Sequence, residues 1–227
     1  MHAVLHHIHP ETPLISTFWF RPAKPLRYIA GQFTELHLPH ADTDNRGDKR
    51  WFTLSSSPTD ELVSVTTRLD PEQLSSFKRT LFGLEAGAAV TLAEPMGDFV
   101  LPLDKDRPLV FAAVGLGITP IHSMIRWLGD TGQQRPITML YATKTAAEAA
   151  FRPLLQQASI DFKLLEAESK LTSEHIAAMP HAQNNALVYL SGPEPVIERF
   201  VAELPHLGVD SSRLVTDYFH GYTESTL

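Results

Sequence analysis

Apolar and polar residues alternate in short segments over the first hundred residues of the chain. Segments 15–20 and 32–38 each alternate over the length of one strand, and 51–55, 61–67 and 88–93 are shorter strand candidates. Proline, glycine and asparagine residues typical of turns separate these segments. Several short strands at such spacing predict an antiparallel barrel or sandwich.

One amphipathic segment interrupts this β-rich half. Leu74, Phe77, Leu81 and Leu84 form an apolar stripe that predicts a helix over about 72–82, and Gly83 is a plausible residue to end it.

The pattern changes after a linker candidate at 101–108. Segment 109–114 is continuously apolar, as expected of a strand buried on both faces. Strand and helix patterns then alternate, which predicts a parallel sheet with helices on both faces. The further strands are expected at 137–141, 161–165, 187–190 and 213–216, and the helices at 119–128, 152–157, 173–179 and 195–204. We therefore expect two domains, at 1–105 and 106–227.

Composition narrows the possible chemistry. The chain of 227 residues has no cysteine, so it can form no disulfide, thiolate nucleophile or cysteine-ligated iron–sulfur cluster. Its formal net charge of −7 argues against nucleic acid as the main partner. The cluster of His6, His7 and His9 lacks the spacing of a metal site, and no metal is expected. No signal peptide or apolar run of membrane-spanning length is apparent, so a cytoplasmic location is expected.

A glycine pair lies where the buried strand should give way to a helix. Gly115 and Gly117 would allow close approach of a phosphate to backbone amides. Thr119 is a suitable N-cap and Pro120 a suitable first helical residue. Proline replaces the third glycine of the usual dinucleotide fingerprint, and a plain tight turn is the alternative interpretation.

Two polar motifs in the β-rich half could hold a second anionic, planar ligand. In Arg50-Trp51-Phe52-Thr53, Arg50 offers a fork of donors for a pyrophosphate, Phe52 a surface for a flat ring and Thr53 a hydrogen bond. The alternative is a solvated arginine on a strand whose aromatic residues are core. Ser75 and Ser76, in the first turn of the expected helix, could hold a phosphate or simply start the helix.

The order of these motifs, followed by Ser191-Gly192-Pro193, resembles the ferredoxin–NADP(+) reductase superfamily over about residues 10–222. The resemblance implies an N-terminal antiparallel six-stranded β-barrel that binds FAD and a C-terminal Rossmann-like parallel α/β sheet that binds NADPH or NADH. It also implies a flavoprotein reductase without a fused iron–sulfur domain. Hydride would pass from NAD(P)H to FAD, and single electrons to a separate redox protein such as a ferredoxin, flavodoxin or oxygenase component.

The resemblance also assigns roles to residues. Thr53, Ser191 and Phe219 would lie at the reacting centre. Phe219 would cover the flavin, with Tyr218 and Tyr222 behind it, although a docked hydrophobic tail is an alternative. The expected cofactor-binding residues are Arg50, Trp51, Phe52, Thr53, Thr67, Ser75, Ser76, Gly115, Gly117, Thr119, Pro120, Lys144, Gly192, Pro193 and Phe219.

This chain departs from the family pattern at several positions. Phe52 replaces a more frequent tyrosine, Ser191 a frequent cysteine and Val114 a frequent glycine, and no glycine directly precedes Ser75. Lys144, after the second strand of the α/β half, could face a 2′-phosphate and so favour NADPH, or could be a solvated surface lysine.

Two other functions remain open at this stage. One is a reductase that acts directly on a small acceptor such as free flavin or a ferric chelate. The other is a non-catalytic module that binds flavin or nucleotide to regulate an oxidoreductase complex. The departures from the family pattern are compatible with this second function.

Overall fold

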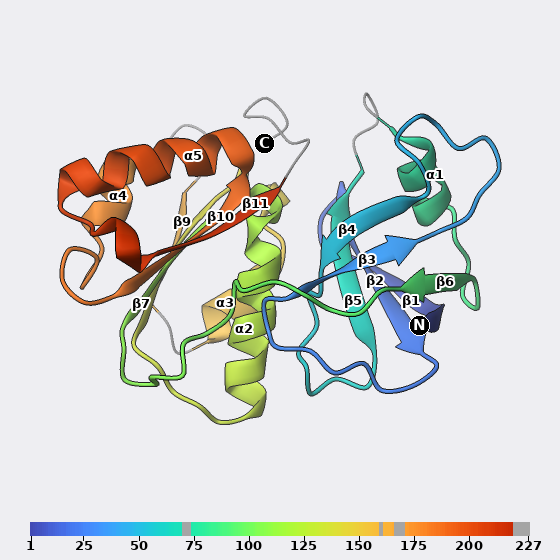
Figure 1. The fold of residues 1–227 in the computed structure, drawn as a ribbon, viewed down its shortest axis with the longest axis horizontal. Coiled ribbons are helices and arrows are strands. Elements are labelled where there is room, and N and C mark those ends of the chain that lie inside the picture. The colour runs from blue at the N-terminus through green and yellow to red at the C-terminus, as the bar shows by residue number, and fades with distance from the viewer. Residues whose placement is uncertain (70–73, 159–160, 166–170, 220–227) are drawn as a thin grey trace.

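The computed structural model describes residues 1–69, 74–158, 161–165 and 171–219. It contains two sheets that lie side by side, with helix α2 (Ile118–Asp130) between them (Figure 1). One sheet is antiparallel and the other is parallel. This arrangement confirms the expected fold class.

The N-terminal sheet forms the barrel, in the strand order β4-β3-β6-β1-β2-β5. Its edge strands approach each other where Leu54 bridges to Val65 and the Ser55 amide donates to the Ser64 carbonyl over 2.8 Å. Fourteen buried apolar side chains fill its interior. The strands are β1 (His2–Pro10), β2 (Ile15–Pro22), β3 (Phe33–His37), β4 (Lys49–Thr53), β5 (Val63–Arg68) and β6 (Ala89–Leu92).

The first strand, β1, is absent from the sequence prediction. Ala3 and Leu5 are buried in the barrel, but the register shifts between Leu5 and His7 and leaves His6 and His7 both exposed. A bulge of this kind breaks the period of two on which strand recognition depends.

The helix of the barrel, α1 (Ser76–Phe82), is shorter than the predicted 72–82, of which residues 72 and 73 lie outside the described ranges. Phe77 and Leu81 are fully buried, and Gly83 is the C-cap, as predicted.

The C-terminal sheet has five parallel strands in the order β11-β10-β7-β8-β9. Helices α2 and α3 pack on one face, and α4 and α5 on the other, as predicted (Figure 1). We call this part the α/β lobe. Its remaining elements are β7 (Leu109–Val114), β8 (Ile137–Ala142), α3 (Arg152–Gln157), β9 (Asp161–Leu165), α4 (Ser173–Ala177), β10 (Leu187–Pro193), α5 (Glu194–Glu203) and β11 (Leu214–Phe219).

Helix α2 joins the two parts through polar contacts with the barrel segment that follows β4. His122 Nδ1–H donates to the Ser55 carbonyl over 2.7 Å, and the Ser123 hydroxyl donates to the Ser56 carbonyl over 2.6 Å. These four residues are buried, so the contacts hold α2 at a fixed position against the barrel.

The chain passes from one sheet to the other between β6 and β7, and the domain boundary at residue 105 stays a prediction. Within the described ranges, no helix is both long enough and apolar enough to cross a membrane.

Candidate functional site

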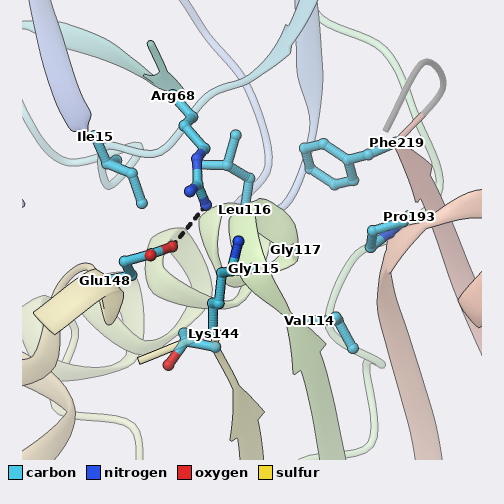
Figure 2. A pocket seen from close by; sticks show the side chains of 11 residues that line it. Ile15, Arg68, Val114, Gly115, Leu116, Gly117, Lys144, Glu148, Pro193 and Phe219 are labelled. Carbon is cyan, nitrogen blue, oxygen red and sulfur yellow. Dashed lines mark hydrogen bonds and ion pairs between the residues drawn. The ribbon is translucent and has the colours of Figure 1, made fainter. Parts of the chain in front are cut away.

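A narrow crevice opens between the barrel and the α/β lobe (Figure 2). Ile15 and Arg68 line it from the barrel, and the turn Gly115–Gly117 lies opposite. Its free volume is about 20 Å³. The other lining residues are Val114, Thr143, Lys144, Glu148, Pro193 and Phe219.

The glycine turn has its shape because the backbone approaches a neighbouring strand closely. Gly115 has a φ of 56°, and a Cβ on Gly117 would lie 2.0 Å from the Ser191 carbonyl oxygen of β10. No side chain larger than hydrogen fits at Gly117 without moving this backbone. The shape of the turn therefore favours glycine at both positions, and their contact with a phosphate stays a prediction.

The prediction that Thr119 caps α2 is wrong. Gly117 already has a helical conformation, so α2 starts at Ile118 and places Thr119 and Pro120 inside the first turn. The Thr119 hydroxyl donates to the Leu116 carbonyl over 3.0 Å, and both residues are buried. Thr119 thus stabilises the glycine turn from within the helix.

The ends of β10 and β11 form another wall of the crevice. Pro193 and Phe219 are register partners on these strands, and both line the crevice. A Cβ on Gly192 would lie 2.9 Å from the Val114 Cβ, so glycine at 192 accommodates the valine at 114.

Ser191 does not line the crevice. It is fully buried, and its hydroxyl donates to the Asp217 carboxylate over 3.2 Å. Its predicted place near the hydride path therefore stays a prediction. Tyr218 is 37% exposed and does not line the crevice either, and Tyr222 lies outside the described residues.

An ion pair that the sequence analysis missed crosses the crevice. Arg68, the last residue of β5, donates from Nη1 to Glu148 Oε2 over 2.7 Å. Both side chains are mostly buried, at 16% and 18% exposure. Figure 2 shows the Lys144 side chain extending into the same space. The only sequence signals were a basic residue directly after a predicted strand and an acidic residue in a loop, and neither is specific.

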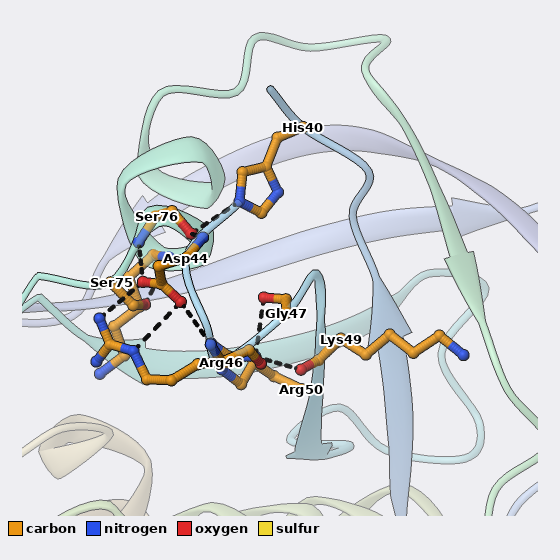
Figure 3. A network of polar contacts seen from close by, with 9 residues as sticks. His40, Asp44, Arg46, Gly47, Lys49, Arg50, Ser75 and Ser76 are labelled. Carbon is orange, nitrogen blue, oxygen red and sulfur yellow. Dashed lines mark hydrogen bonds and ion pairs between the residues drawn. The ribbon is translucent and has the colours of Figure 1, made fainter. Parts of the chain in front are cut away.

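The barrel half of the predicted site is centred on Arg50 (Figure 3). Arg50 Nη1 donates to the carbonyl oxygens of Arg46 and Gly47 over 2.7 and 3.2 Å. Its guanidinium lies 5.1 Å from the centre of the Phe77 ring. The Phe52 ring is 6.0 Å from the same ring, so Arg50 and Phe52 share a strand face, as alternation predicts.

Asp44 occupies the start of α1 in this structure (Figure 3). Its carboxylate accepts a hydrogen bond of 2.9 Å from the Ser76 amide and one of 2.8 Å from the Arg46 guanidinium. These contacts, that of Arg46 first, hold the pKa of Asp44 well below its usual range. The Ser75 hydroxyl accepts an amide within its own helix. A phosphate at Ser75 and Ser76 would therefore have to displace the Asp44 carboxylate.

Two further predicted barrel residues, Trp51 and Thr53, follow Arg50 on β4. Trp51 is 54% exposed and packs edge-on against Phe33 with ring centres 5.5 Å apart. Thr53 is buried at the end of β4, where it pairs with Phe33. Trp51 thus lies on the outer surface, away from the ring pair formed by Phe52 and Phe77.

Two buried polar atoms of the barrel have no partner among the described residues. They are Arg50 Nη2 on β4 and Thr67 Oγ1 on β5. Strand β4 lies beside β5, and β5 lies against the glycine turn. Arg50, Phe52 and the two serines do not themselves line the crevice.

No family model matches the chain. Over 95% of its length it is 26% identical to flavohemoprotein B of Dictyostelium discoideum, and over 93% it is 23% identical to the reductase component of propane 2-monooxygenase of Mycolicibacterium goodii. The chain spans 58% and 65% of these two relatives. The flavohem-like FAD/NAD binding domain of nitric oxide dioxygenase from Vibrio cholerae superposes with a TM-score of 0.80 at 22% identity, and the match covers 96% of this chain and 98% of that domain.

Proposed function

We propose that the chain is a member of the ferredoxin–NADP(+) reductase superfamily and an NAD(P)H-dependent oxidoreductase with FAD as its flavin, and its fold and its relatives support this proposal. One observation carries the proposal. The crevice joins the barrel to the glycine turn and to the ends of β10 and β11, so that a ligand entering it touches both parts of the molecule. A single crevice between the two parts is what a reaction between two bound nucleotides needs.

The barrel residues fit a flavin dinucleotide. Arg50 Nη2 and Thr67 Oγ1 are buried polar atoms without partners, and a diphosphate and a flavin ring system offer the acceptors that they lack. The half-buried Phe52 ring offers an apolar surface beside Arg50, with the buried Phe77 ring behind it. We therefore assign FAD binding to Arg50, Phe52, Thr53 and Thr67, with Trp51, Ser75 and Ser76 at the margin.

The α/β residues fit a pyridine nucleotide. Gly115 and Gly117 keep the backbone accessible in the crevice, with Thr119 and Pro120 behind them. Pro193 and Phe219 form another wall, with Gly192 directly before Pro193. Lys144 adds a positive charge, which favours NADPH over NADH. When bound, the cofactors supply the redox chemistry, with hydride passing from NAD(P)H to FAD. The protein positions both and excludes water, and Phe219 has to move aside for a nicotinamide.

The proposed electron acceptor is a separate redox protein. The reductase component of propane 2-monooxygenase is one relative whose name implies such a partner. These 227 residues contain no cysteine, so they cannot themselves hold an acceptor iron–sulfur cluster with cysteine ligands.

The direct test is anaerobic titration of the FAD-loaded protein with NADPH and then with NADH. We expect the visible flavin absorbance to disappear with either nucleotide, and with lower concentrations of NADPH. A protein that does not take up FAD, or whose bound FAD keeps its colour, would contradict the proposal.

A panel of acceptors then separates the three functions considered above. Rapid turnover with a ferredoxin or flavodoxin supports the proposed partner, and turnover only with free flavin or a ferric chelate supports direct reduction of small acceptors. Slow reduction of the bound flavin without turnover on any acceptor supports a regulatory module.

A further inference from the structure

The crevice is too small for a nicotinamide ring as it stands. Its free volume is about 20 Å³, whereas a cavity that holds benzene measures about 150 Å³. Some part of the lining must therefore move before a nucleotide can enter. The close backbone contacts at Gly117 and Gly192 make the glycine turn and the end of β10 poor candidates for this movement.

Phe219, proposed above to move aside for the nicotinamide, lies on the side of β10 and β11, and the Arg68–Glu148 pair is the candidate on the barrel side. It connects β5 of the barrel to the loop after β8, and it consists of two long side chains that can change rotamer without backbone movement. Figure 2 shows the pair beside Leu116 and the glycine turn, in the space that a ligand at this turn would enter. The pair therefore closes the crevice from the barrel side.

The charges around the crevice favour an anionic ligand in place of Glu148. Arg68 and Lys144 contribute two cations to the lining, and Glu148 contributes one carboxylate. Phosphate oxygens offer Arg68 the same kind of acceptor as a carboxylate does. Because β5 lies against the Gly115–Gly117 turn, Arg68 is close to where this turn would present its amides to a diphosphate.

We infer that Glu148 is a built-in competitor of the nucleotide: Arg68 pairs with Glu148 in the free protein and exchanges it for the diphosphate of the bound pyridine nucleotide. This inference rests on the proposed function, because it concerns the same crevice. It makes Arg68 a nucleotide-positioning residue contributed by the barrel and Glu148 a residue that lowers nucleotide affinity.

Neutralising the two halves of this ion pair should change affinity in opposite directions. We would titrate the FAD-loaded protein with ADP-ribose in a calorimeter, so that no redox reaction is involved. Arg68→Gln should weaken ADP-ribose binding about tenfold, since a charge-assisted contact is lost. Glu148→Gln should tighten it about fivefold, since the Glu148 carboxylate no longer competes for Arg68.

Two further probes identify the group that Arg68 contacts. Adenosine carries no phosphate, and its affinity should be the same in both variants and the wild type. Adenosine 2′-monophosphate carries only the 2′-phosphate, and its affinity should also be unchanged. A tenfold loss for adenosine 2′-monophosphate in Arg68→Gln, with ADP-ribose unchanged, would contradict contact with the diphosphate.

The molecule offers a matched control. Arg126 Nη2 pairs with Asp60 Oδ1 over 2.8 Å, and this pair also joins the two parts of the molecule, with 28% and 21% of the side chains exposed. Neither residue lines the crevice. Arg126→Gln and Asp60→Asn should leave ADP-ribose affinity within about twofold of the wild type, since neither residue is placed to contact a ligand in the crevice.

The outcomes separate this inference from the proposed function. If Arg68→Gln and Glu148→Gln shift affinity in the same direction, the pair is a structural link and the inference is wrong, although the nucleotide site stands. If the wild-type protein binds neither ADP-ribose nor NADP⁺, both the inference and the proposed function are wrong. If Arg68→Gln does not fold, Arg68→Lys replaces it, because lysine keeps the positive charge but lacks the planar fork of donors. Unchanged ADP-ribose affinity in both Arg68→Lys and Glu148→Gln would also overturn the inference.

Discussion

The two halves of the proposed site are built in different ways. In the α/β half, backbone segments meet so closely that glycine is required, as at Gly117 against Ser191 and at Gly192 against Val114. In the barrel half, polar side chains of one surface loop occupy the donors, as Asp44 does at the Ser76 amide. Rearranging closely packed backbone costs much free energy, whereas a polar side-chain contact can be exchanged for a similar contact with a ligand at little cost in free energy.

This difference predicts which property each half controls. Substitutions of the packed glycines in the α/β half should change mainly the stability of the lobe, and substitutions around Arg50 in the barrel half should change mainly the affinity for the flavin.

The largest effect is expected from Gly117→Ala. The added Cβ would lie 2.0 Å from the Ser191 carbonyl oxygen, a backbone atom that cannot move without shifting β10. The free energy of unfolding should fall by about 3 kcal/mol or more, measured by urea denaturation.

Gly129→Ala is the matched control in the same helix, because a Cβ there meets nothing within 4 Å. It should raise the free energy of unfolding by up to about 1 kcal/mol through helix propensity. If Gly117→Ala unfolds like the wild type, the contrast between the two halves is wrong.

Next in size is Arg50→Gln, which removes the guanidinium whose Nη2 lies buried without a partner among the described residues. The dissociation constant for FAD should rise about 100-fold, which corresponds to about 2.7 kcal/mol. Fluorescence titration with FAD measures it. Arg50→Lys should fall between this variant and the wild type, and an unchanged FAD affinity in Arg50→Gln would remove Arg50 from the site.

The contact between helix α2 and the barrel, made by His122, should be sensitive to acid. Burial lowers the pKa of His122 to about 3, and the ring is stacked on Phe151 with centres 3.7 Å apart. Because this folded-state pKa is below the ordinary value of about 6.5, the unfolded chain binds the proton more readily. The stability that the neutral His122 ring contributes is therefore fully present above about pH 6.5, and it is lost as the pH falls from there toward about 3.

At pH 5 the His122 contribution should lower the free energy of unfolding by about 2 kcal/mol relative to pH 7.5. Urea denaturation of the wild type and of His122→Asn at both pH values isolates this contribution. Equal losses in the two proteins would show that other groups account for the acid sensitivity.

The smallest effect is expected from Asp44→Asn. This change removes the negative charge that occupies the Ser76 amide, and it should tighten FAD binding about fivefold if the FAD diphosphate competes with Asp44. Asp48→Asn is the control, because Asp48 belongs to the same loop but pairs with His37 over 2.9 Å. Weaker FAD binding in Asp44→Asn would mean that Asp44 organises the site instead of competing for it.

The same contrast decides how much of the molecule could be predicted from its sequence. The strands of the α/β lobe were predicted well, since a strand buried on both faces is continuously apolar, as in Leu109–Val114. The glycine positions were predicted because few other residues allow such turns. In contrast, β1 was missed because a bulge after Leu5 interrupts its alternation.

The polar contacts that complete the site were not predictable in this way. Asp44 and Ser76 are 32 residues apart, and Arg68 and Glu148 are 80 residues apart. Each pair meets only through the tertiary fold, and a single acidic residue in a loop carries no signal of its partner. The Thr119 cap failed for a local reason, since the glycine turn continued directly into α2.

The most direct test of the account is a crystal structure of the protein with FAD and NADP⁺ bound. The account predicts the FAD diphosphate at Arg50 and the nicotinamide end of NADP⁺ in the crevice between the Gly115–Gly117 turn and Phe219. It would be contradicted by NADP⁺ bound away from the glycine turn, or by flavin and nicotinamide rings that share no contact.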